Sequence, residues 1–132
     1  VGTGSGILAI SAAKLGASDV LATDISDESM TATQENMKLN GLSNIKVQKT
    51  SLLKDVKGKF DIILANILAE ILVELIPQLD SHLNENGQVI FSGIDYLQMP
   101  KIKAALDKNG FKIDLTMRQG RWVGLCITRK EH

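Results

Sequence analysis

The feature that most constrains the fold is the glycine-rich start of the chain, Val1-Gly2-Thr3-Gly4-Ser5-Gly6, followed at once by a mostly apolar run over residues 7–15. Glycine lacks a Cβ atom, so it adopts positive φ angles and lets backbone N–H groups approach a ligand closely. A hydrophobic residue that leads into such a turn and then into a helix is typical of a nucleotide-binding βα turn. The alternative is a tight strand-to-helix turn that binds nothing.

The glycine spacing narrows the class of cofactor. The dinucleotide fingerprint G-x-G-x-x-G would place its third glycine at position 7, which is Ile7. The pattern here is G-x-G-x-G, which resembles motif I of S-adenosylmethionine-dependent methyltransferases. We interpret Val1 as the last residue of a first, central strand, so we expect this chain to be a trimmed piece of something longer.

Composition indicates a single α/β domain with an aliphatic core. The chain has 132 residues, of which 44% are hydrophobic and 4% aromatic, and its formal net charge is zero. A balanced charge gives no electrostatic footprint for direct binding of nucleic acid or of an anionic membrane. The single cysteine, Cys126, excludes an intrachain disulfide or a zinc site built from cysteines, and we interpret it as a buried thiol. No transmembrane run or signal peptide is visible, so a cytoplasmic location is the expectation.

The hydrophobic period switches repeatedly between that of a helix and that of a strand. Helices are predicted over 5–15, 26 to about 40, 68 to about 83 and 100–109, and strands over 19–24, 45–49, 60–66, 88–92, 111–117 and 122–128. Alternating β and α units predict a doubly wound, mostly parallel sheet with helices on both faces. The last two strands are joined near Gly120 and are expected to pair antiparallel. With the first strand counted, we predict a seven-stranded, Rossmann-like methyltransferase sheet over residues 1–132.

Polar residues follow three of the predicted strands, at the edge of the sheet where parallel α/β folds bind ligands. Asp24, with Ile25 next to it, ends the strand after the glycine turn, and its carboxylate can accept hydrogen bonds from two ribose hydroxyls; an exposed strand-end acid is the alternative. Ser51 and Leu52 follow the next strand, where they would flank an adenine or form an ordinary loop. Asn66 follows the strand 60–66, where its carbonyl can accept from an incoming amine or cap the next helix.

The series V-G-T-G-S-G-I-L-A-I, A-T-D-I-S, L-A-N-I-L-A, F-S-G-I and R-W-V-G-L resembles the PrmA family, methyltransferases of ribosomal large-subunit protein eleven. The resemblance covers essentially the whole chain. It implies transfer of methyl groups from S-adenosylmethionine to lysine and N-terminal amines of that ribosomal protein. The residues it implies are Gly2, Thr3, Gly4, Gly6, Asp24 and Ile25 for the cofactor, Ser51 and Leu52 near adenine, and Asn66 at the methyl-transfer site. The family's acid before the first glycine and its N-terminal substrate domain would precede Val1.

The predicted reaction uses no metal and no histidine base, because His82 lies late in a helix and His132 is the terminus. Tyr96 and Trp122 could wall the amine pocket, with core packing as the alternative for Trp122. Three other functions stay open: a nicotinamide-dependent oxidoreductase, disfavoured by Ile7 and the terminal hairpin; a non-catalytic module that binds the cofactor; and a methyltransferase of another protein or a small molecule. The oligomeric state is not readable from this sequence.

Overall fold

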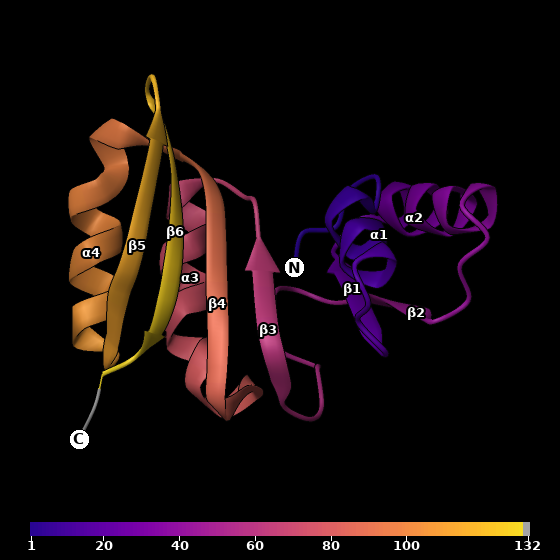
Figure 1. Ribbon diagram of the computed structural model, residues 1–132, viewed down its shortest axis with the longest axis horizontal. Coiled ribbons are helices and arrows are strands. Elements are labelled where there is room, and N and C mark those ends of the chain that lie inside the picture. The colour runs from indigo at the N-terminus through magenta and orange to yellow at the C-terminus, as the bar shows by residue number, and fades with distance from the viewer. Residues whose placement is uncertain (131–132) are drawn as a thin grey trace. The chain divides into compact units, whose positions relative to one another are not determined.

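The computed structural model describes residues 1–130 and divides the chain into two compact units, Val1–Val56 and Lys57–His132. Both units combine helices with parallel strands (Figure 1), as the mixed α/β class predicts. The assignment of residues 1–132 to one cofactor-binding domain stays a prediction.

The first unit contains two helices and two strands, which are α1 (Ile7–Lys14), β1 (Val20–Asp24), α2 (Asp27–Leu39) and β2 (Ile45–Lys49). The strands pair in parallel from Val20↔Ile45 to Asp24↔Lys49. Parallel strands need a crossover between them, and α2 provides it. Ala9 of α1, Ala22 of β1 and Ile45 of β2 form the buried core of this unit, and Met37 of α2 packs against it.

Local signals set the ends of α2. The Ser26 hydroxyl accepts a hydrogen bond from the Ser29 amide at 3.1 Å, so it satisfies one of the free N–H groups of the first turn. Asp27 and Glu28 place negative charge at the positive end of the helix dipole. The helix stops at Asn40, and Gly41 follows with φ +65°. These bounds confirm the prediction for this helix, whereas α1 begins two residues later than predicted because Gly6 is its N-cap, with φ +89°.

The second unit is a four-stranded sheet of order β3-β4-β6-β5, in which β3 and β4 are parallel and the other pairs antiparallel. Figure 1 shows α3 behind the sheet and α4 alongside β5. The pairing of the last two strands confirms the predicted antiparallel hairpin. The elements are β3 (Phe60–Ala65), α3 (Ala69–Leu79), η1 (Asp80–His82), β4 (Leu83–Asp95), η2 (Tyr96–Gln98), α4 (Met99–Lys108), β5 (Phe111–Gln119) and β6 (Trp122–Arg129).

The core of this unit lies between the sheet and its helices. Leu72, Leu75, Ile76 and Leu79 of α3 are fully buried, and their spacing of three and four residues puts them on one face of the helix. The largest fully buried side chains that complete the core from the strands and α4 are Leu83, Phe91, Ile94, Ile102, Leu106, Phe111, Leu125 and Ile127.

Three predictions for this unit are wrong in detail. The helix predicted to reach about Leu83 ends at Leu79, and β4 begins at Leu83 instead of residue 88. The reason is a distant residue: the Arg129 guanidinium donates to the carbonyls of Leu83 and Asn84 at 2.6 and 2.8 Å, which anchors the polar start of the strand. Cys126 is half-buried rather than buried. None of the described helices is long and apolar enough to cross a membrane.

Candidate functional site

The glycine turn adopts the backbone that its composition predicts. Gly2, Gly4 and Gly6 have φ angles of +66°, +53° and +89°, which side-chain-bearing residues rarely adopt. Gly6 is also constrained by space, since a Cβ atom there would lie 2.9 Å from Cγ2 of the buried Thr33 side chain. A Cβ atom on Gly4 would meet nothing within 4 Å. Close packing therefore requires glycine at position 6, while at position 4 only the backbone conformation favours it.

Two side chains of helix α2 donate hydrogen bonds to backbone carbonyls of the glycine turn. The Thr33 hydroxyl donates to the Gly4 carbonyl at 3.1 Å, and the Thr3 hydroxyl oxygen lies 3.4 Å from the Thr33 hydroxyl oxygen. One helical turn further, the Asn36 side-chain amide donates to the Ser5 carbonyl at 2.7 Å. Sequence analysis missed Thr33 and Asn36. Their i, i+3 spacing puts them on one face of the helix, but nothing in the sequence shows that this face meets the turn.

Asp24 joins the glycine turn to the end of β1. One carboxylate oxygen accepts from the Gly4 amide and the other from the Ser26 amide, both at 3.1 Å. Each carboxylate oxygen can accept more than one hydrogen bond, so both keep acceptor capacity for further donors. The carboxylate is half-buried, whereas the next side chain, Ile25, is exposed. The structure thus brings the predicted Asp24 and Gly4 into direct contact.

The loop after β2 contacts Asp24 at the end of β1. The Thr50 amide donates to the Asp24 carbonyl at 2.9 Å, and the Thr50 hydroxyl accepts from the Asp55 amide at 3.3 Å. Ser51 follows and is exposed. Leu52 has φ +54° and is the single non-glycine residue with a positive φ among residues 1–130. Such conformations cost about 1–3 kcal/mol and are frequent at active sites and ligand-binding loops. The role of Ser51 and Leu52 beside an adenine stays a prediction.

Asn66 lies in the second unit, directly after β3. The N-cap of α3 is Leu68, so the alternative role of Asn66 as that helix cap is wrong. Its side chain is exposed and, within residues 1–130, makes no hydrogen bond. The Oδ1 atom lies against Gly93 of β4, where a Cβ atom would come within 2.1 Å of it. An exposed amide held beside a strand end is available to an incoming donor.

The end of β4 and the tip of the β5–β6 hairpin carry exposed aromatic and charged side chains. Tyr96 is 46% exposed and Trp122 is 53% exposed, so core packing does not explain Trp122. The guanidinium of Arg118 lies 3.6 Å from the Tyr96 ring centre, and that of Arg121 lies 5.4 Å from Trp122. Each ring thus already has an arginine on one face, which leaves a single face for the methylated ammonium that we expect there.

Asp95, the last residue of β4, has a side-chain pKa that is clearly shifted from its ordinary value. Arg121 donates a side-chain hydrogen bond to its carboxylate, and the Leu97 amide donates another at 3.1 Å. Together they hold the pKa of the Asp95 carboxyl below its ordinary value, with the Arg121 hydrogen bond as the larger cause. This carboxylate is therefore engaged in an ion pair and is no candidate for a base.

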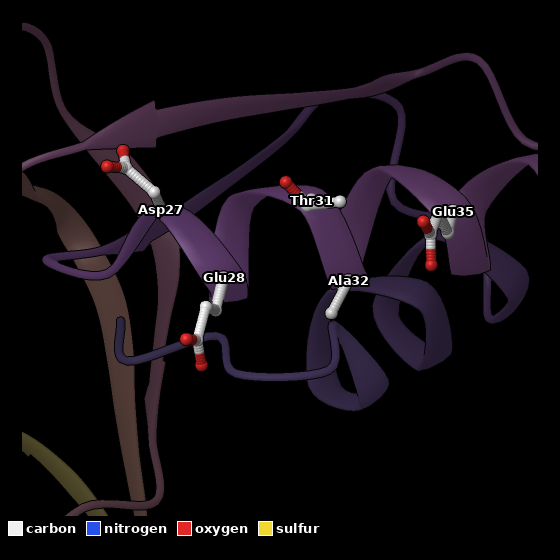
Figure 2. Close-up of a pocket in the computed structure, with 5 residues that line it drawn as sticks. All are labelled: Asp27, Glu28, Thr31, Ala32 and Glu35. Carbon is white, nitrogen blue, oxygen red and sulfur yellow. The ribbon is translucent and has the colours of Figure 1, made fainter.

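A surface groove of about 370 Å³ on α2 lies apart from the predicted residues. It is lined by Asp27, Glu28, Thr31, Ala32 and Glu35 (Figure 2). All five side chains come from one helix, and Lys49 already pairs with Asp27 at 3.1 Å. The groove is an acidic helix surface rather than a cofactor site. Across residues 1–130 there is no group of three or more histidine, cysteine, aspartate or glutamate side chains that could hold a metal ion.

Comparison with known proteins identifies a family. The family model of ribosomal protein L11 methyltransferase (PrmA) matches residues 1–130. The chain is 80% identical to the ribosomal protein L11 methyltransferase of Lactobacillus helveticus over 131 residues, which are 99% of this chain and 42% of that protein. The corresponding protein of Pediococcus pentosaceus is 46% identical and is covered to the same 42%.

Solved structures agree with this comparison. The crystal structure of a ribosomal protein L11 methylase from Lactobacillus delbrueckii subsp. bulgaricus is 75% identical, with a TM-score of 0.97 over 98% of this chain and 68% of that chain. A precorrin-6y C5,15-methyltransferase from Geobacter metallireducens has a TM-score of 0.81 over 99% of this chain and 77% of that chain. Its identity is 16%, so that likeness concerns the fold alone.

Proposed function

The chain belongs to the ribosomal protein L11 methyltransferase (PrmA) family, and we propose that it is the cofactor-binding and methyl-transferring segment of such an enzyme. The observation that carries this proposal is the 80% identity to the L. helveticus protein over 99% of the chain. Because the chain spans 42% of the length of that relative, the activity of a whole enzyme is part of the proposal. The substrate would be ribosomal protein L11, methylated on lysine or N-terminal amines.

We infer that the first unit holds S-adenosylmethionine. The turn of Gly2, Thr3, Gly4 and Gly6 would hold the cofactor, because its three glycines let a ligand approach the backbone. The Asp24 carboxylate has acceptor capacity left for ribose hydroxyls. Ser51 and Leu52 would flank the adenine, which the positive φ of Leu52 supports, and Ile25 beside Asp24 would be a further cofactor-binding residue. When bound, the cofactor supplies a methyl group on a positively charged sulfur.

Asn66 would orient the amine that receives the methyl group. A lysine amine has an ordinary pKa of about 10.4, so it must lose a proton before it attacks, and a water-poor pocket favours that loss. The Asn66 carbonyl can accept a hydrogen bond from the remaining N–H and so align the lone pair with the methyl carbon. We expect no histidine base, because His82 directly precedes Leu83, which pairs with Phe60 at the start of β3, whereas Asn66 follows the end of that strand. His132 lies outside the described residues.

The proposal also covers the number of strands in the sheet, the absence of a metal, the binding partners and the cellular location of the enzyme. A seven-stranded sheet needs one strand more than the six described, which form one sheet of two strands and one of four. We expect no metal, no direct contact with nucleic acid or membrane, and a cytoplasmic location. A methyltransferase of another protein or of a small molecule, and a cofactor-binding segment without catalysis, are the alternatives.

The proposal is tested in a chimera in which this chain replaces its matching segment in the L. helveticus protein, so that the rest of the enzyme is present. Mass spectrometry of ribosomal protein L11 after incubation with S-adenosylmethionine should show added methyl groups. Asn66→Ala should lower kcat by about 100-fold, because a reacting group that is misplaced by about 1 Å loses that much. The dissociation constant of S-adenosylhomocysteine should stay unchanged. No methylation by the unsubstituted chimera would contradict the proposed function, and unchanged turnover in Asn66→Ala would contradict the role of Asn66.

A further inference from the structure

Strand β4 contains a bulge close to its carboxyl end. In the antiparallel pairing with β6, Phe91 faces Leu125 and Ile94 faces Val123, so two residues of β4 stand opposite the single residue Gly124. A bulge of this kind bends the strand and redirects the side chains around it, and bulges are frequent next to active sites. The second of the two residues opposite Gly124 is Gly93, whose φ is +69°.

The glycine at the bulge leaves room for one particular side chain. A Cβ atom on Gly93 would lie 2.1 Å from Oδ1 of Asn66 and 3.2 Å from its Cγ. Real Cβ atoms essentially never come this close to another heavy atom, so one of the two groups would have to move. Gly124, on the opposite strand, differs, because a Cβ atom there would meet only the Phe91 carbonyl at an ordinary 3.6 Å. Of the glycines in the bulge, Gly93 alone is required by a side-chain contact.

The contact with Gly93 limits the positions that the Asn66 side-chain amide can adopt on the side that faces β4. The side chain is exposed and makes no hydrogen bond within residues 1–130, so no polar partner fixes its orientation. Gly93 lies in β4 and Asn66 directly follows the parallel strand β3, whose last residue, Ala65, pairs with Phe91 two positions before Gly93. The bare backbone of the bulge therefore forms the wall against which the amide rests.

We propose that Gly93 is a positioning residue for Asn66: the bulge presents a surface without a side chain, and the Asn66 carbonyl occupies the space that a Cβ atom would fill. This inference rests on the proposed function, in which Asn66 orients the methyl-accepting amine. A side chain at position 93 would turn the amide away from the amine and slow transfer, and it would leave the cofactor residues of the other unit as they are.

The test compares Gly93→Ala with Gly110→Ala in the chimera. Gly110 belongs to the same unit and has φ +83°, but a Cβ atom there meets nothing within 4 Å, so its substitution carries backbone strain without the clash. Gly93→Ala should lower kcat about 10- to 100-fold. The KM for S-adenosylmethionine should change by less than about threefold, and Gly110→Ala should keep kcat within the same limit. Equal kcat values for the two variants would overturn the proposal.

A double-mutant comparison separates positioning from general damage to β4. In the Asn66→Ala background the clashing oxygen is gone, so adding Gly93→Ala should change kcat by less than about threefold. If Gly93→Ala alone fails to fold, the double variant should fold again, because the clash is its cause. The proposal would be overturned if Gly93→Ala lowered kcat, or prevented folding, as strongly in the Asn66→Ala background as it does when Asn66 is present. Gly93 would then be needed only for the backbone conformation of β4.

A readout that needs no activity distinguishes this inference from the proposed function. With ¹⁵N-labelled asparagine, the side-chain amide signals of Asn66 are assigned by their absence in Asn66→Ala. They should shift in Gly93→Ala and stay in place in Gly110→Ala. Unmoved signals would overturn the positioning role even in an active enzyme. Shifted signals in an enzyme that does not methylate L11 would support the contact and contradict the proposed function.

Discussion

Gly6 and Gly93 both have positive φ angles and both lie where a Cβ atom would collide with a side chain, but their surroundings differ. Gly6 packs against Thr33, which is fully buried and bonded to the Gly4 carbonyl. Gly93 packs against the exposed Asn66, which has no hydrogen-bond partner among residues 1–130. The glycine turn is thus part of a braced core, whereas the bulge shapes a surface side chain. Substitution should cost stability at the first site and turnover at the second.

The largest effect on stability is expected for Gly6→Ala. The substitution forces a positive φ on alanine and drives its methyl group into a buried side chain, so unfolding should become easier by about 2–4 kcal/mol. Denaturant unfolding of the chimera measures this. Gly41→Ala is the matched control, because Gly41 has φ +65° in the same unit with open space around it, and it should cost only about 1 kcal/mol. Equal losses in the two variants would contradict the packing role of Gly6.

A smaller effect is expected when the brace itself is removed. Thr33→Val keeps the shape of the side chain but deletes the hydroxyl that donates to the Gly4 carbonyl, so stability should fall by about 1–2 kcal/mol. Thr33→Ser retains the hydroxyl and serves as the control for hydrogen bonding. Because Gly4 also contacts Asp24, the valine variant should bind S-adenosylhomocysteine more weakly than the serine variant in calorimetry. Equal affinities would show that the brace has no part in the cofactor site.

The smallest effect concerns the exposed edge of the second unit. The pKa of Asp95 is lowered in the folded protein, so its contribution to stability is present above the unfolded pKa of about 3.9 and is lost as the pH falls through the lower, folded value. Arg121→Met removes the main cause. NMR titration of the Asp95 carboxyl should then show a higher pKa, whereas Arg118→Met, which removes the partner of Tyr96, should leave it unchanged. An unchanged Asp95 pKa in Arg121→Met would refute the assignment of the shift.

The parts of the molecule set by nearby residues could be predicted from the sequence. The capping serine at 26 and the Asn40-Gly41 stop fix α2, and the turn near Gly120 fixes the terminal hairpin. The start of β4 could not be predicted, because residues 83–87 are largely polar and are anchored by Arg129, more than forty positions away. Local signals are visible in a sequence, whereas a guanidinium that bonds distant carbonyls is not.

In the candidate site, too, some features follow from local sequence and others depend on contacts between distant residues. The positions of Asp24 and Asn66 at strand ends follow from the order of strands and loops. The contacts that orient them do not: Thr33 and Asn36 reach the glycine turn from a helix that begins after Asp24, and the space for Asn66 depends on a bulge opposite Gly124. In the sequence, Gly93 is visible only within the F-S-G-I series of the family resemblance, whereas in the structure a Cβ atom on it would lie 2.1 Å from Oδ1 of Asn66.

The most direct test of the account is calorimetric titration of the chimera with S-adenosylhomocysteine and, as a control, with NAD. The account predicts that S-adenosylhomocysteine binds with one site per chain and that NAD does not bind. Asp24→Asn should weaken the binding at least about tenfold, because an amide N–H₂ replaces one of two charged acceptors. Binding of NAD, or equal affinity of the wild-type and Asp24→Asn proteins for S-adenosylhomocysteine, would contradict the assignment of the cofactor site.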